Sequence, residues 1–98
     1  MEQQIVKSIM DYLAYKRFFH WRNNTGALKT ERGGFMRFGS VGSPDIFCLR
    51  QGTIFGIEVK RPKGKQSPAQ LEWEKGFTEN GGTYILAFSL DDIVHKIT

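Results

Sequence analysis

The chain has 98 residues, of which 40% are hydrophobic and 24% charged, a composition typical of one folded, soluble domain. Its single cysteine, Cys48, excludes an internal disulfide and fits a reducing compartment. No apolar run approaches the ~20 residues of a membrane-spanning helix, and the N-terminal sequence lacks the pattern of a signal peptide. A secreted mini-protein, a zinc finger and a membrane protein are thus excluded, and we expect a cytoplasmic domain over residues 1–98.

The positive charge of the chain is concentrated in its centre. The formal net charge is +4, and residues 29–65 hold eight basic side chains against three acidic ones, whereas the rest of the chain has six basic and seven acidic residues. A localised basic segment is typical of proteins that bind polyanions, nucleic acids above all. A solvated surface without a target is the alternative.

The first forty residues predict one helix, one strand and a long loop. Apolar side chains recur at helical spacing over residues 2–17, with Glu2 near the middle of the apolar face. A carboxylate there either favours the positive end of the helix dipole or serves a site. The aromatic-rich residues 18–22 predict a strand. Residues 23–42 are glycine-rich and predict a long loop, with a short strand at 35–38, and such loops are usually functional or mobile.

The middle of the chain predicts a hairpin and a second helix. Residues 45–50 and 53–60 are expected to pair as antiparallel strands around a glycine-containing turn. Ser67 then has the position of an N-cap, followed by proline at the first helical position and Gln70 at the reciprocal position of a capping box. This helix is expected to reach about Asn80, before a pair of glycines.

A strand over residues 83–88 and a short helix complete the predicted order. Ser89 is expected to cap the last helix, with Asp92 at the capping-box position and three apolar side chains facing inward. The second helix can carry a crossover to a parallel strand. The order therefore predicts an α/β domain with a small mixed sheet flanked by helices. The inward-facing side chains are Ile93, Val94 and Ile97.

An acid and a lysine share one face of the second hairpin strand. Side chains alternate along a strand, so Glu58 and Lys60 lie on one face and Val59 on the other. Both are costly on so apolar a strand unless they are used, although a surface salt bridge is the simpler alternative. Asp45 opens the neighbouring strand and can bring a second carboxylate to the same place. Two carboxylates suit Mg²⁺, which prefers oxygen ligands, and a nearby lysine suits phosphodiester hydrolysis.

The sequence from Ser43-Pro44-Asp45 to Glu58-Val59-Lys60 resembles the PD-(D/E)xK nuclease superfamily. The fuller pattern resembles one branch of it, the VRR-NUC domains, through the blocks EQQIVKSIMDYL, WRNNTGA, RFGSVGSPDIF and IEVKRPKGKQSPAQLEW. These blocks cover nearly the whole chain. The resemblance implies a restriction-endonuclease-like core and a stand-alone domain of the viral or bacterial type, located in a bacterial cell or a phage-infected host.

The resemblance also implies roles for individual residues. Asp45 and Glu58 would be ligands of Mg²⁺ or Mn²⁺, together with the backbone carbonyl of Val59, and Lys60 would be the catalytic lysine. Glu2 matches an acid that family members place near the metal, often through water. The site residues thus implied as catalytic are Asp45, Glu58, Lys60, Gln70 and Glu2; for Gln70 and Glu2, capping and the helix dipole remain the alternatives.

Several other residues are assigned from their chemistry alone. Six basic side chains are candidate phosphate contacts on DNA. Asn23 and Asn24 contact DNA or shape a turn. Trp21 and Trp73 are interpreted as core or interface residues, His20 and His95 as structural, and Cys48 as a buried apolar side chain. The candidate phosphate contacts are Arg22, Lys29, Arg32, Arg37, Lys63 and Lys65.

The expected function is a metal-dependent, structure-specific DNA endonuclease that acts as a homodimer on Holliday junctions. One site cuts one strand, and a twofold dimer supplies the two symmetric cuts that a four-way junction requires. The strand at residues 18–22 and the first helix are candidate dimer surfaces. Alternatives are a nuclease for flaps or other branched DNA, a basic DNA-binding module without catalysis, and a small-molecule phosphohydrolase.

Overall fold

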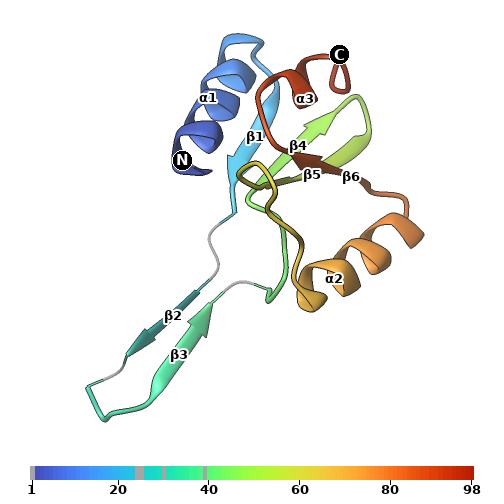
Figure 1. Cartoon of the computed structure of the whole chain (residues 1–98). Coiled ribbons are helices and arrows are strands. Elements are labelled where there is room, and N and C mark those ends of the chain that lie inside the picture. The colour runs from blue at the N-terminus through green and yellow to red at the C-terminus, as the bar shows by residue number, and fades with distance from the viewer. Residues whose placement is uncertain (1, 24–25, 30, 39) are drawn as a thin grey trace.

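A four-stranded mixed sheet, with strands in the order β1-β4-β5-β6, organises the chain (Figure 1). The computed structural model describes all residues except 1, 24–25, 30 and 39, and it gives 26–29 and 35–38 as backbone alone. The elements are α1 (Glu2–Tyr15), β1 (Phe19–Arg22), β2 (Gly26–Lys29), β3 (Phe35–Phe38), β4 (Ile46–Arg50), β5 (Thr53–Val59), α2 (Pro68–Glu79), β6 (Thr83–Ala87) and α3 (Asp91–Val94).

The predicted hairpin and crossover are confirmed by the pairing of the strands. β1 and β5 both pair antiparallel with β4, and β6 pairs parallel with β5 after the α2 crossover. The turn between β4 and β5 has positive φ angles of 51° at Gln51 and 84° at Gly52, the backbone of a tight hairpin turn whose twist matches the strands. The mixed sheet flanked by helices thus agrees with the predicted fold class.

The core lies between one face of the sheet and the helices α1 and α3. Cys48, predicted to be buried, has no exposed surface, and burial raises the pKa of its thiol against the opposing effect of Arg50. Within the part of the chain that the structure describes, no helix is long and apolar enough to cross a bilayer. The buried apolar side chains are Ile9, Leu13, Phe18, Ile46, Cys48, Ile57, Val59, Ile85, Ala87, Ile93 and Ile97.

The opposite face of the sheet is covered by α2 over only part of its width. Phe47 on β4 contacts the α2 side chains Trp73 and Phe77, with ring centroids 5.9 and 6.1 Å away. On the other side of Phe47, Trp21 lies at 5.4 Å and contacts Phe19 on the edge strand β1. The outer end of this aromatic row faces solvent, since Phe19 is 68% exposed and Trp21 40%.

The predicted loop over residues 23–42 is the main departure from expectation. The short strand at 35–38 is confirmed as β3, but residues 26–29 form a second strand, β2, and the two pair antiparallel from Gly26 opposite Phe38 to Lys29 opposite Phe35. Figure 1 shows this ribbon projecting away from the main sheet. The prediction missed β2 because Gly-Ala-Leu-Lys has little intrinsic strand preference, so its conformation depends on pairing with β3.

Two helix ends also differ from the prediction. α1 ends at Tyr15 because Arg17 has a φ of 60°, and the N–H of Phe18 bonds back to the carbonyl of Leu13 at 3.0 Å. In α3 the N-cap position is Leu90, without a side-chain capping hydrogen bond, so the predicted cap at Ser89 is wrong. The predicted position of Asp92 is confirmed, because its carboxylate accepts the N–H of Ser89 at 3.2 Å and also that of Phe88 at 2.7 Å.

Candidate active site

Asp45 and Glu58 lie side by side where β4 begins and β5 ends. The strand register sets Ile46 opposite Ile57, and one step beyond this pair brings Asp45 beside Glu58. The N–H of Asp45 donates to the carbonyl of Ile57 at 2.9 Å, and the N–H of Val59 donates to Oδ2 of Asp45 at 2.8 Å. The carboxylate that precedes β4 is therefore held against the end of β5.

Glu58 and Lys60 share one face of the sheet, as strand alternation predicts. Nζ of Lys60 lies 4.0 Å from Oε2 of Glu58, while the side chain of Val59 is buried in the core on the other face. The two charged side chains are 5% and 17% exposed, so this pair is not a solvated surface salt bridge. The N–H of Lys60 also donates to the carbonyl of Ala87 at 2.9 Å, which extends the β5–β6 pairing beneath the lysine.

The surroundings of Glu58 destabilise the ionised form of its side chain. Oε1 is buried and, among the residues the structure describes, has no hydrogen-bond partner. Burial, and next the neighbouring charge of Asp45, raise the pKa of Glu58 from about 4.5 to about 8, against the opposing effect of Lys60. A buried acid with a shifted pKa and a specific charged partner is typical of functional sites.

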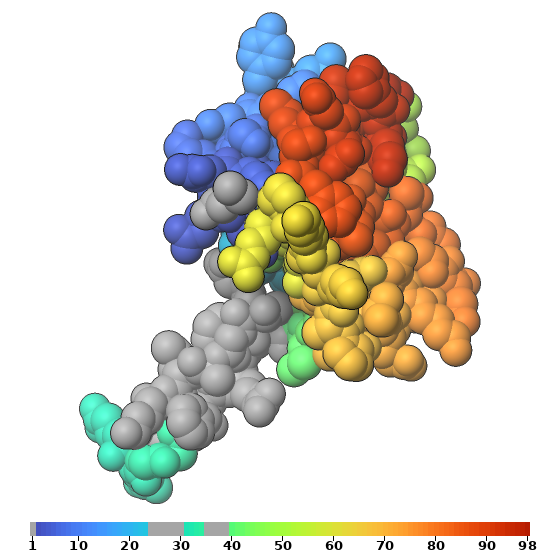
Figure 2. All heavy atoms as spheres, viewed as in Figure 1, coloured from blue at the N-terminus to red at the C-terminus, as the bar shows by residue number. Residues whose placement is uncertain are grey.

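The first residue of α1 reaches the same end of the sheet. Oε2 of Glu2 accepts a hydrogen bond from the N–H of Arg61 at 3.3 Å, and the charge of Glu2 makes a small further contribution to the raised pKa of Glu58. Figure 2 shows the loop after β5, drawn in yellow, between the first turn of α1 and α2. Glu2 is therefore close enough to Glu58 to affect its pKa, and its role near a metal stays a prediction.

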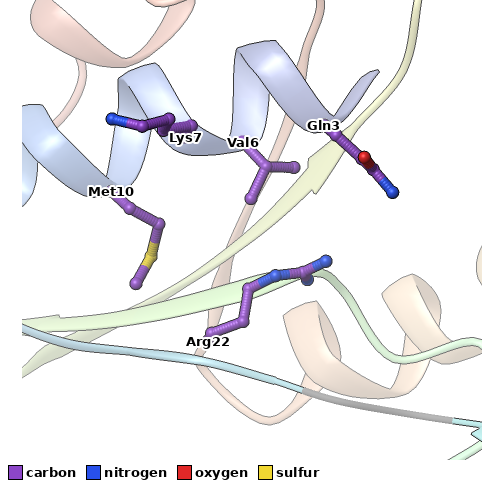
Figure 3. A pocket seen from close by; sticks show the side chains of 5 residues that line it. All are labelled: Gln3, Val6, Lys7, Met10 and Arg22. Atoms are coloured by element: carbon purple, nitrogen blue, oxygen red, sulfur yellow. The ribbon is translucent and has the colours of Figure 1, made fainter. Parts of the chain in front are cut away.

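Arg22 links the end of β1 to Asp45 and closes one side of a pocket. Its Nη1 donates to the carbonyl oxygen of Asp45 at 2.8 Å and lies 3.5 Å from Oδ1. The side chain extends beneath α1 toward Gln3, with Val6 and Met10 directed at it from the helix (Figure 3). This arrangement leaves a cavity of about 390 Å³ beside the candidate site. The cavity is lined by Gln3, Val6, Lys7, Met10 and Arg22.

The segment before Asp45 is fixed by side-chain hydrogen bonds. Nδ2 of Asn23 donates to Oγ of Ser43 at 2.7 Å and to the carbonyl of Pro44 at 2.8 Å. These bonds join two segments that are distant in the sequence, so neither a turn nor a DNA contact is shown for Asn23, and Asn24 lies outside the described residues. Gly42, with a φ of 86°, packs directly on the backbone of Ala69 in α2, where a Cβ has no room.

Gln70 occupies the capping box that the sequence predicts. Its Oε1 accepts the N–H of Ser67 at 2.9 Å, and its own N–H donates to Oγ of Ser67 at 3.2 Å. The side chain therefore stabilises the first turn of α2. Within the described part of the chain, no hydrogen bond joins this side chain to Asp45, Glu58 or Lys60.

Comparison with known proteins relates this architecture to one solved fold. No family model and no curated protein sequence matches the chain. A solved structure described as a "VRR_NUC domain" superposes with a TM-score of 0.71 over 99% of this chain and 97% of that chain, at 20% sequence identity. The chain has the VRR-NUC fold. The restriction-endonuclease-like fold class expected from the sequence is therefore confirmed.

The VRR-NUC fold places some of the candidate phosphate contacts near the carboxylates and others far from them. Lys63 and Lys65 are exposed on the loop between β5 and α2, which adjoins the site. Arg32 is exposed in the turn between β2 and β3, on the projecting ribbon. Lys29 and Arg37 lie on the two strands of that ribbon, and their side chains are outside the described part of the structure.

Tyr84 is a residue near the candidate site that the sequence analysis did not select. Its hydroxyl accepts a hydrogen bond from Gln66 at 3.3 Å, and Gln66 also donates to Glu74 at 2.9 Å. Burial raises the pKa of Tyr84, Gln66 opposes this shift and the charge of Glu58 adds to it. Alternation along the strands could have indicated it. Tyr84 pairs with Gly56, which lies two residues before Glu58 on β5, so Tyr84 and Glu58 lie on the same face of the sheet.

Proposed function

We propose that this chain is a metal-dependent nuclease that hydrolyses phosphodiester bonds in DNA. The observation that carries the proposal is the convergence of Asp45, Glu58 and Lys60 at one end of the sheet of a VRR-NUC fold. The unpartnered Glu58 oxygen and the neighbouring carboxylate destabilise the fold unless a ligand uses them. Four basic residues at and after the end of β5 support a polymeric anion as substrate; they are Lys60, Arg61, Lys63 and Lys65.

The chemistry of the donor set fits a hard divalent cation. Glu58 offers a buried oxygen that the described structure leaves unpaired, and Asp45 offers a carboxylate beside it. Mg²⁺ and Mn²⁺ prefer such oxygen ligands. No cluster of three His, Cys, Asp or Glu side chains suited to a metal occurs among the described residues, so we propose the carbonyl of Val59, and Glu2 through water, as the remaining contacts.

The protein's own groups have distinct roles in the proposed reaction. When bound, the metal would polarise the phosphate and lower the pKa of water. Lys60 would orient the attacking water or stabilise the negative charge that develops on the phosphate. Arg22, already anchored on Asp45, would contact a phosphate next to the cleaved bond. Gln70 would contribute through the position of α2.

We propose a four-way DNA junction as the substrate and a homodimer as the active form. A junction requires two symmetric cuts, and a twofold dimer presents two sites related by symmetry. The edge strand β1 supports this assembly, because Phe19 is 68% exposed and Trp21 40%, and Leu49 on β4 is also exposed at 41%. A nuclease acting on flaps is the alternative substrate class.

Cleavage of labelled synthetic DNAs in Mg²⁺ or Mn²⁺ tests the proposed activity. The substrates are a four-way junction, a 5′ flap, plain duplex and single strand. Paired symmetric cuts confined to the junction are expected. Cuts mainly in the flap would replace the junction with the flap as substrate, and binding without cutting in either metal would contradict the nuclease proposal in favour of a DNA-binding module.

Sedimentation measures the proposed dimer separately. The native mass should be twice the 11.2 kDa of the chain. Phe19→Glu should halve this mass, because it places a charge in the exposed aromatic patch, whereas Leu71→Glu is the control at a 53% exposed position on α2. A monomeric wild-type protein that still makes paired cuts would contradict the symmetric assembly.

A further inference from the structure

A second cavity lies at the opposite end of the sheet from the candidate active site. It has a volume of about 460 Å³ and opens between the end of α1, the end of β4 and the C-terminal segment. β4 runs from Ile46, next to Asp45, to Arg50, so about 17 Å of extended strand separates Asp45 from this cavity. A space of this size accommodates a small ligand. The cavity is lined by Tyr12, Lys16, Phe18, Arg50, Val94, Ile97 and Thr98.

Two cations of this cavity are gathered around one buried ring. The guanidinium carbon of Arg50 lies 4.6 Å from the centroid of Phe18, and Nζ of Lys16 lies 6.0 Å from it. Phe18 is 8% exposed and therefore a fixed support. The ring attracts both cations, which also repel each other. Within the described residues, neither Arg50 nor Lys16 forms a salt bridge, and no Asp or Glu side chain lines the cavity.

One side-chain donor of Arg50 has no partner within the described part of the fold. Its Nε is buried and has no hydrogen-bond partner among the described residues. An unsatisfied buried donor destabilises the fold, and it does so more strongly when it is charged. By contrast, Arg22 in the cavity beside the candidate active site is bonded to Asp45, and Lys7 there is paired with Asp11 at 2.7 Å. Of these two cavities, the second is therefore the one whose cations have no Asp or Glu partner among the described residues.

From these observations we infer that the cavity around Arg50 and Lys16 is a binding site for a phosphate group. A guanidinium presents a planar set of donors that matches phosphate oxygens, and an adjacent ammonium adds a second charge-assisted contact. Bound phosphate would neutralise the two cations that Phe18 holds together. The phosphate belongs either to a DNA backbone well away from the cut or to a free phosphorylated small molecule. The site is independent of the proposed nuclease activity.

The side-chain N–H of Arg50 is the reporter for this inference. Because Nε is buried, its proton should exchange slowly and give a resolved ¹⁵N–¹H signal, which is followed in EDTA while pyrophosphate is added. A saturable shift is expected in the wild-type protein. Lys16→Ala should weaken the apparent affinity by about tenfold, the loss of one charge-assisted contact. Lys7→Ala, on the same helix but paired with Asp11, should leave it unchanged.

The controls separate a built site from general charge screening. A shift that does not saturate, that sodium chloride reproduces at equal ionic strength, or that the two lysine variants alter equally would overturn the inference. Short duplex DNA, added in EDTA so that no cleavage occurs, identifies the source of the phosphate. A shift with both DNA and pyrophosphate supports the site and points to a DNA backbone, and a shift with pyrophosphate alone supports it and points to a small molecule.

Discussion

The backbone N–H of Val59 donates a 2.8 Å hydrogen bond to Oδ2 of Asp45, which ties the end of β5 to the residue before β4. Asp45 is thereby fixed although it lies outside the strand. Its other oxygen lies 3.5 Å from Nη1 of Arg22. The carboxylate is therefore oriented by backbone and cation together, and its neighbour Glu58 is held at the same end of the sheet.

Asp45→Asn should remove metal binding and leave the fold intact. The asparagine oxygen can still accept the N–H of Val59, but the negative charge is lost. We expect the affinity for Mg²⁺ measured by calorimetry to fall by more than about 100-fold, beyond the loss seen on changing an outer partner of a metal site. Asp91→Asn, at an exposed position on α3, is the matched control. An unchanged affinity for Mg²⁺ in Asp45→Asn would show that the metal binds at a different place.

Glu58→Gln should stabilise the metal-free protein at neutral and alkaline pH while it abolishes cleavage. The folded protein holds the Glu58 proton up to about pH 8, whereas the unfolded chain releases it near pH 4.5. The folded state thus binds more protons between these values, and its free energy of unfolding falls as pH rises through that window. Below about pH 4.5 both states are protonated, so Glu58 adds no pH dependence there.

Denaturant unfolding in EDTA at pH 5 and pH 8 measures this effect. Glu58→Gln should gain more stability relative to wild type at pH 8 than at pH 5. Glu72→Gln, at an exposed position on α2, should show no such difference. A loss of stability in Glu58→Gln at pH 8 would show that the buried carboxylate is satisfied within the fold.

Gly42→Ala should destabilise the protein and displace the segment that carries Asp45. Gly42 combines a positive φ of 86° with direct packing on the backbone of Ala69, whereas Gly33 has a similar φ of 84° and open space around its Cβ position. We expect a loss of roughly 2–4 kcal/mol for Gly42→Ala and about 1 kcal/mol for Gly33→Ala, measured by denaturant unfolding. Equal losses of stability in the two variants would mean that the close approach of Gly42 to α2 does not add to the destabilisation.

Gln70→Ala separates capping from a direct role in catalysis. Ser67→Ala removes the other half of the same capping box, and each variant should lose about 1 kcal/mol of stability. If Gln70 acts only through the start of α2, the two variants should cleave DNA at equal rates well below their melting temperatures. A loss of cleavage confined to Gln70→Ala would assign its side chain a direct contact with substrate.

Local patterns predicted most of the sheet and the centre of the candidate site. Strand alternation placed Glu58 and Lys60 on one face, and the turn between residues 50 and 53 defined the hairpin that brings Asp45 beside them. Long-range contacts were not predictable in this way. The bond from Arg22 to Asp45 depends on the pairing of β1 with β4, and β2 depends on its partner strand rather than on its own residues.

The rate of junction cleavage in Lys60→Ala, compared with Lys63→Ala, tests the central claim most directly. Lys60 lies 4.0 Å from Glu58, whereas Lys63 is exposed on the following loop, so the two variants remove the same charge from different places. Lys60→Ala should lower the rate by at least about 100-fold, the contribution typical of one positioned catalytic group, with DNA binding retained in Ca²⁺. Lys63→Ala should weaken binding modestly and cleave at saturation like wild type. Equal cleavage rates at saturating protein would contradict a catalytic site built on Asp45, Glu58 and Lys60.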